Sequence, residues 1–119
     1  MTDVKAETSS GLDSTPLRVL IFGAHPDDCD IRAGGTACLY ARHGHQVRMV
    51  SLTNGDAGHY AIGGAPLAWR RREEAAAAGR QLGVDYLVLD YPDGRLEPSL
   101  EARARVVGLI REMVPDLVV

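Results

Sequence analysis

Several residue types and patterns are scarce in this sequence. It has two cysteines in 119 residues and no apolar run approaching the roughly 20 residues that a membrane-spanning helix needs. Its N-terminus is polar and lacks the apolar segment of a secretory signal peptide. Cys29 and Cys38 lie nine residues apart, which fits a reduced protein better than a disulfide scaffold. These absences predict a cytoplasmic protein that is neither secreted nor inserted in a membrane.

The sequence also has fewer basic than acidic side chains. The 13 Lys and Arg side chains face 16 Asp and Glu side chains, and the net charge is −3 at pH 7. Nucleic acids and anionic membranes select basic faces, so we expect no nucleic-acid partner. A chain of this length supports one domain with a packed core, because it can bury roughly two-thirds of its unfolded surface.

Short apolar runs alternate with helix-like stretches behind a polar leader. Residues 1–16 are rich in Ser, Thr, Asp and Gly, and we expect them to be disordered. Runs bounded by Gly and Pro predict strands, and longer stretches stopped by Gly or Pro predict helices. The predicted order is strand 17–22, helix 31–43, strand 47–52, helix 66–82, strand 86–89, a helix from Pro98 to the stop at Pro115, and strand 116–119. This order predicts a Rossmann-like three-layer α/β/α fold with a mostly parallel sheet.

The carboxyl ends of the predicted strands are where a site is expected. In open parallel sheets, ligands bind beyond those ends. The three loops there, 23–30, 53–64 and 90–95, are rich in Asp, His, Asn and Gly. The functional site is therefore predicted at this edge of the sheet.

The first of these loops carries the most informative motif, His25-Pro26-Asp27-Asp28. Imidazole and carboxylate are good ligands for Zn²⁺, and Pro26 makes the turn rigid, so that His25 and Asp28 can converge on one metal ion. Asp27 then points elsewhere and could hold or deprotonate a metal-bound water. The alternative is an ordinary helix N-cap made by Asp28 or Asp30. The whole cluster favours the metal site.

Placed after a strand, His25-Pro26-Asp27-Asp28 resembles the PIG-L/LmbE-like family of zinc-dependent N-acetylglucosaminyl deacetylases. Four further features match it: Gly34-Gly35-Thr36, the stretch from Ser51 to Gly58, the pair Arg71 and Glu74, and Asp93-Gly94. The similarity covers about residues 17–119. It implies a deacetylase domain of which this chain is the N-terminal part, truncated after the fourth strand.

The resemblance also implies roles for individual residues. His25 and Asp28 become zinc ligands and Asp27 the general base. The family's third ligand is a His in a loop just after the fourth strand, which we expect beyond Val119. Asp30 stands where the family usually has Glu. The implied partner is a small-molecule amino-sugar conjugate, and the 119-residue chain alone is expected to be inactive.

Four residues are candidates for substrate binding, each with a simpler interpretation. Asn54 and Asp56 are typical turn residues as well as plausible partners for sugar hydroxyls. Arg71 can form an ordinary helical pair with Glu74, although the resemblance favours its turning toward the substrate. Asp93 is a turn residue first and a site residue second.

A non-catalytic alternative competes with the enzyme. A Rossmann-like module could bind a nucleotide or sugar without chemistry, but the Gly-x-Gly-x-x-Gly expected after the first strand is absent. His59, in the second loop, could approach the metal or be a polar loop residue. An open sheet edge can also pair with a second copy, which adds a homo-oligomer to the expected partners.

Overall fold

The computed structural model describes residues 15–119, and all seven predicted elements are present there. The order is β1 (Arg18–Gly23), α2 (Asp28–Arg42), β2 (Gln46–Thr53), α3 (Gly64–Leu82), β3 (Asp85–Tyr91), α4 (Leu100–Met113) and β4 (Leu117–Val118). Most of the predicted leader, 1–16, lies outside the described residues. The predicted order of strands and helices is confirmed.

The first helix begins earlier than predicted. It starts at Asp28 instead of Ile31, because Asp28 N–H donates to the carbonyl of His25 and Ile31 N–H to that of Asp27. The helix therefore grows directly out of the motif. None of the acidic residues there caps the helix in the expected way: Asp27 holds the N-cap position without a side-chain hydrogen bond.

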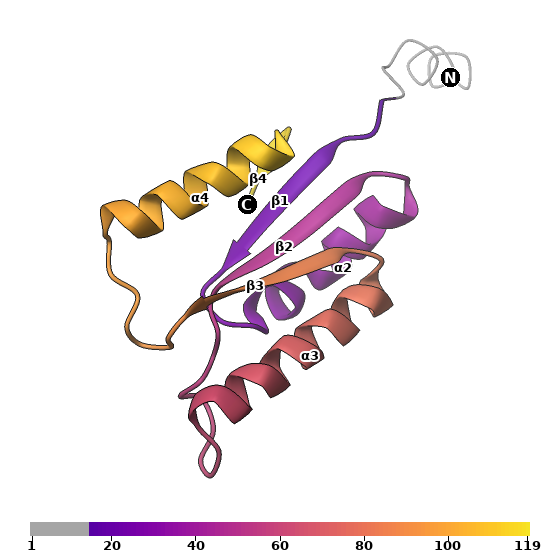
Figure 1. The fold of residues 1–119 in the computed structure, drawn as a ribbon. Coiled ribbons are helices and arrows are strands. Elements are labelled where there is room, and N and C mark those ends of the chain that lie inside the picture. Colours follow the sequence, from indigo (N-terminus) through magenta and orange to yellow (C-terminus); the bar gives the residue numbers. More distant parts are fainter. Residues whose placement is uncertain (1–14) are drawn as a thin grey trace, which may run out of the picture.

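All strand pairs are parallel, and the order across the sheet is β3-β2-β1-β4. Figure 1 shows α2 and α3 along one side of the strands and α4 along the other. The predicted three-layer α/β/α arrangement is confirmed. Since the strands are parallel, the loops that follow β1, β2 and β3 emerge at one edge.

Two apolar cores lie on opposite faces of the sheet, because successive side chains of a strand point to opposite faces. Val19, Ile21 and Met49 pack with α2 on one face, and Leu20 and Val50 pack with α4 on the other. Burying one such side chain contributes about 1.5–3 kcal/mol. Because both faces of β1 are buried, the residues that follow it start from a rigid base.

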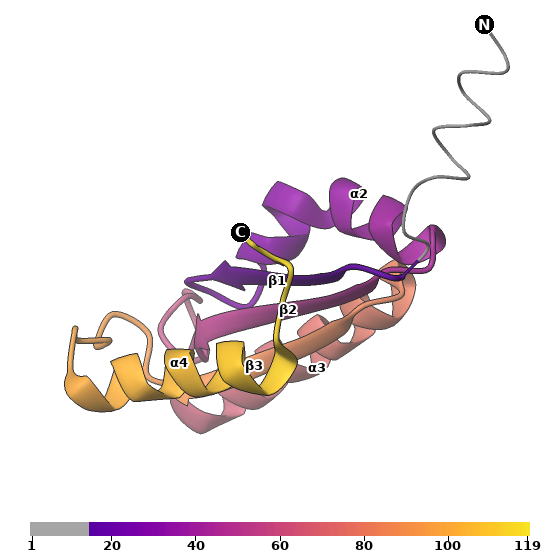
Figure 2. The same ribbon diagram turned by 90° about the horizontal axis from the view of Figure 1, so that it is seen from above.

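The last residues of the chain run alongside β1 (Figure 2). Val119 N–H donates to the Leu20 carbonyl at 2.9 Å, and Phe22 N–H donates to the Val119 carbonyl at 2.8 Å. Before them, α4 ends at Met113, as Pro115 predicts, through Val114 in the left-handed conformation at φ 52°. Within residues 15–119, no helix combines the length and apolarity needed to cross a membrane.

Candidate metal centre

Backbone hydrogen bonds join the ends of the three neighbouring strands. The Ala24 carbonyl, just after β1, accepts from the Thr53 N–H at 3.0 Å and from the Thr53 hydroxyl at 2.7 Å. Asn54 N–H in turn donates to the Tyr91 carbonyl of β3 at 2.9 Å. The first residues of all three loops are thereby held at fixed separations.

Close contact between the first two loops depends on a glycine. Gly55 has φ +72°, and a Cβ there would lie 3.0 Å from Cδ of the buried Pro26. Only glycine adopts this conformation without strain and leaves room for the proline ring. The second loop therefore lies directly against the motif.

The His25 ring lies between two carboxylates. Its Nδ1 is 3.4 Å from Oδ2 of Asp28, and its Nε2 is 2.9 Å from Oδ1 of Asp93. Oδ2 of Asp28 also accepts backbone N–H groups from Ala24 at 3.0 Å and His25 at 2.8 Å. The structure thus brings together His25 and Asp93, from the loops after β1 and β3, and Asp28, the first residue of α2.

Asp27 differs from its neighbour Asp28. Its side chain is exposed, and no hydrogen bond or ion pair holds its carboxylate within the described part of the chain. The structure leaves this carboxylate free to contact solvent or a ligand beside the motif.

Asn54, Asp56 and Asp93 form a chain of hydrogen bonds. Oδ1 of Asn54 accepts from Asp56 N–H at 3.1 Å, and Oδ1 of Asp56 accepts from Asp93 N–H at 2.9 Å. The amide of Asn54, which is 5% exposed, donates to Asp90 at 3.2 Å. Three of the four predicted substrate residues therefore already hold the loops together. Sequence reasoning did not find Asp90, which at the end of a strand carries no distinguishing signal.

Beneath the motif, a tyrosine supports the first loop from β3. The Tyr86 hydroxyl lies 3.0 Å from the Pro26 carbonyl and 2.9 Å from Oδ1 of Asp30. Burial and the bond to Asp30 raise the pKa of Tyr86, so it stays a neutral donor. Asp30 therefore supports the loop indirectly. Sequence reasoning missed Tyr86 because strand tyrosines are common and nothing in its spacing links it to the motif.

The cysteine next to the motif is a packing residue. Cys29 is 2% exposed, and its thiol faces the carbonyls of Ile21 at 3.6 Å and Val50 at 3.7 Å. Burial raises the pKa of the Cys29 thiol to about 11. Both cysteines are free, and Cys29 points into the core instead of toward His25.

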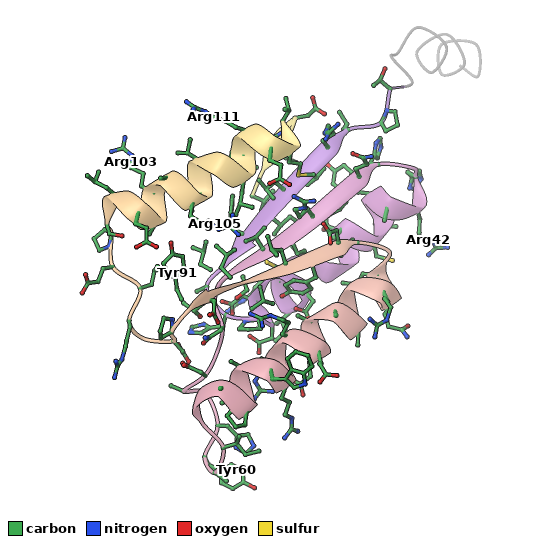
Figure 3. The ribbon with its side chains drawn as sticks, in the orientation of Figure 1. Arg42, Tyr60, Tyr91, Arg103, Arg105 and Arg111 are labelled. Atoms are coloured by element: carbon green, nitrogen blue, oxygen red, sulfur yellow. The ribbon has the colours of Figure 1, made fainter. Side chains whose placement is uncertain are left out.

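Arg71 and His59, the other two candidates, have partners of their own. The Arg71 guanidinium pairs with Glu74 at 2.5 Å and, together with Arg70, lowers the pKa of that carboxyl. Nδ1 of His59 accepts from the N–H groups of Ala61 and Ile62, both at 3.1 Å. The His59 ring stacks on Tyr60, at the exposed tip of the loop in Figure 3. No hydrogen bond or ion pair joins either residue to His25 or Asp28 within residues 15–119.

The donor atoms of His25 and Asp28 fit a zinc ion. With Zn–N and Zn–O bonds of about 2.0–2.2 Å, two ligands of a tetrahedral centre lie about 3.4 Å apart. Nδ1 of His25 and Oδ2 of Asp28 show this separation, 3.4 Å. Across residues 15–119, however, no three His, Cys, Asp or Glu side chains converge as a full ligand set. These residues supply two good ligands and not a complete site.

Comparison with known proteins identifies the family. The family model described as "GlcNAc-PI de-N-acetylase", PIG-L, matches residues 20–119. Diacetylchitobiose deacetylase of Thermococcus kodakarensis is 36% identical over 104 residues, covering 85% of this chain and 39% of that protein. A 4-oxalmesaconate hydratase of Pseudomonas putida is 30% identical over 113 residues, covering 88% of this chain and 44% of the hydratase.

A solved structure leads to the same family. That of N,N'-diacetylchitobiose deacetylase from Pyrococcus horikoshii matches 99% of this chain and 48% of its own, with a TM-score of 0.81 and 30% identity. This chain therefore spans less than half the length of these relatives. From its sequence and its fold alike, the chain belongs to the PIG-L family of de-N-acetylases.

Proposed function

We propose that the protein removes the acetyl group of an N-acetylglucosamine-type conjugate, using a zinc ion held by His25 and Asp28. The observation that carries this is the 3.4 Å separation of Nδ1 and Oδ2 at the end of a buried strand. Two of the relatives are deacetylases of diacetylchitobiose, which supports this substrate class. Because the chain covers less than half of each, the activity is proposed for the whole protein.

The proposed roles follow from how each side chain is held. When bound, zinc polarises a carbonyl and lowers the pKa of a water molecule from about 15.7 toward about 7. Asp28 is fixed by two backbone N–H groups, as a ligand needs to be. Asp27 is exposed and its carboxylate makes no hydrogen bond among the described residues, so it is free to accept the proton of the attacking water.

Substrate contacts are proposed for Asn54, Asp56, Arg71 and Asp93. The hydrogen bonds of Asp56 and Asp93 each use Oδ1, which leaves both Oδ2 atoms for sugar hydroxyls. Asn54 and Asp56 also line an open hollow of about 510 Å³ beside Trp69, a space able to take a sugar-sized group. To bind the substrate, the Arg71 guanidinium would have to break its ion pair with Glu74. An exposed ion pair contributes little free energy, so this change costs little.

A third zinc ligand has to come from outside the described residues. Catalytic zinc sites commonly use three protein ligands plus one open position. We propose that this ligand is a His in a loop after the fourth strand, beyond Val119, as the family resemblance implies. We also propose a cytoplasmic location, since both cysteines are free thiols.

The deciding experiment compares His25→Ala with His43→Ala in the full-length protein. His43 is an exposed histidine at the opposite end of α2, where its ring hydrogen-bonds the Leu39 carbonyl, so it serves as the matched control. We expect near-stoichiometric zinc and acetate release from an N-acetylglucosamine conjugate in wild type and His43→Ala, and loss of both in His25→Ala.

Two results would contradict the proposal. One is full zinc retention in His25→Ala, which would remove the metal assignment. The other is a zinc-loaded wild-type protein that releases no acetate from amino-sugar conjugates but hydrates an unsaturated tricarboxylic acid such as 4-oxalmesaconate. That second result would place the protein with its hydratase relative instead.

A further inference from the structure

The two nitrogens of His25 face acceptors at different distances. Nε2 lies 2.9 Å from Oδ1 of Asp93, the usual length of an N–H···O bond, whereas Nδ1 lies 3.4 Å from Oδ2 of Asp28. Oδ2 of Asp28 already accepts two backbone N–H groups. A neutral imidazole has one N–H to donate, and Asp93 is the better placed acceptor.

The Asp93 carboxylate is itself well held. Its side chain is 14% exposed, and its backbone N–H donates to Oδ1 of Asp56. Asp56 N–H donates to the side chain of Asn54, which is 95% buried at the end of β2. Asp93 is therefore tied to the core of the sheet through two other residues, so its oxygen is a fixed acceptor.

From this arrangement we propose that Asp93 is a positioning residue for His25. Oδ1 of Asp93 accepts the Nε2–H of His25, which keeps the Nδ1 lone pair directed toward Asp28, where the metal would bind. This assignment deepens the proposed function and rests on it for the metal. It differs from a substrate contact, because it uses the oxygen of Asp93 that faces the ring and acts before any substrate is present.

The assignment explains why three loops are tied together at this edge. A ligating imidazole commonly donates its other N–H to a carboxylate, and removing that partner typically lowers metal affinity by about 10–100-fold. His25 comes from the loop after β1 and Asp93 from the loop after β3. Asp56, from the loop between them, supplies the intervening link.

The first test reads the tautomer of His25 directly. Nitrogen-15 NMR spectra of the metal-free, full-length protein at mildly alkaline pH distinguish Nε2–H from Nδ1–H. We expect Nε2–H in wild type and in Asp93→Asn, whose amide oxygen can still accept. Asp93→Ala should release the ring into a mixture of tautomers. Asp85→Ala is the matched control, since Asp85 begins β3, the strand that precedes Asp93, and lies at its opposite end, where it pairs with Arg48.

Three NMR outcomes would overturn the assignment: Nδ1–H in the wild-type protein, a ring protonated on both nitrogens, or an unchanged tautomer in folded Asp93→Ala. Should Asp93→Ala not fold, Nδ1–H in the wild-type spectrum would still overturn the assignment. None of these readings depends on zinc or on turnover.

The second test measures zinc affinity by competition with a chelating dye. We expect Asp93→Ala to bind zinc about 10–100-fold more weakly than wild type, with Asp85→Ala unchanged and Asp93→Asn between the two. Equal affinity in Asp93→Ala and wild type would overturn the positioning role. A wild-type protein that binds no zinc would contradict the proposed function, while the NMR result would still decide how His25 is held.

Discussion

At the scale of single residues, the neighbouring carboxylates of Asp27 and Asp28 show how position separates two identical side chains. Asp28 lies in the first turn of α2, and its Oδ2 accepts the N–H groups of Ala24 and His25. Asp27 is exposed and has no such partner within residues 15–119. The rigid side chain suits a ligand, and the free one suits proton transfer.

This difference predicts opposite outcomes for two matched substitutions in the full-length protein. Asp27→Asn should keep its zinc and lose roughly 10²–10⁴ in turnover, the usual contribution of a general base. Asp28→Asn should lose zinc, because it replaces a charged ligand. Elemental analysis together with acetate release separates the two, and equal zinc loss in both variants would refute the division of roles.

A second prediction at this scale concerns the contact between the first two loops. Gly55→Ala should lower the free energy of unfolding by more than the roughly 1–2 kcal/mol that a left-handed alanine costs, since its Cβ would also meet Pro26. Gly44→Ala is the control: its φ is +87°, and a Cβ there meets nothing within 4 Å. Urea unfolding measures the free energy of unfolding of both variants. Equal decreases would show that Pro26 can move away from the added Cβ without cost.

Residue types and strand ends were enough to predict which side chains gather at this edge. His25 and Asp28 follow β1, and Asp93 follows β3. The pairing of atoms could not be predicted, because it depends on distances between loops from different strands. Tyr86 and Asp90 were missed for the same reason: each is an ordinary strand residue until the fold places it beside Pro26 or Asn54.

At the scale of elements, two helix glycines have opposite surroundings. Gly35 lies in α2, and a Cβ there meets nothing within 4 Å. Gly79 lies in α3, where a Cβ would stand 2.9 Å from the Val84 carbonyl oxygen and 3.1 Å from Cβ of Tyr86. The first glycine leaves space open, whereas the second lets α3 approach the start of β3.

Alanine substitutions at these two positions should therefore change stability in opposite directions. Gly35→Ala should raise the free energy of unfolding by about 0.5–1 kcal/mol, the ordinary gain in a helix interior. Gly79→Ala should lower it by about 1–3 kcal/mol, because backbone has to move. Denaturant unfolding measures both changes, from the shift in midpoint when the dependence of the free energy on denaturant is unchanged. A Gly79→Ala variant more stable than wild type would mean that α3 can shift on the sheet without cost.

Element order was predictable because Gly and Pro bound nearly every segment. The helix ends at Gly44, Gly83 and Pro115 were all placed correctly. The start of α2 was placed too late, because the first apolar residue of the helical pattern is Ile31. The carbonyls of His25 and Asp27 begin the helix instead, and local sequence carries no signal for that.

At the scale of the whole molecule, both sheet faces are covered by helices, yet the proposed metal centre lacks a third ligand among residues 15–119. Residues 15–119 contribute no third His, Cys, Asp or Glu side chain that could complete the ligand set of His25 and Asp28. His59 is not part of such a set: its Nδ1 accepts the N–H groups of Ala61 and Ile62, and its ring stacks on Tyr60. The fold of these residues therefore positions two proposed zinc ligands but not a third.

The 119-residue chain alone should therefore be catalytically silent, even with added zinc. Two ligands hold zinc weakly, and losing a donor to the developing oxyanion typically costs a further 10²–10³, roughly, in turnover. The measurement is amine release from an N-acetylglucosamine conjugate by the purified chain. Robust turnover that His59→Ala abolishes would show that the chain completes its own site.

One irregularity in the sheet bears on how much this chain can vary in length. Ser51 pairs with Val88 but Thr53 with Tyr91, so β3 contains one residue more than β2 over the same span. Each strand residue advances the chain by about 3.3 Å and turns its side chain to the other face. The extra residue acts as a spacer that sets where Asp93 meets His25. Insertions and deletions should therefore be excluded between Val88 and Asp93 and tolerated around the exposed Tyr60.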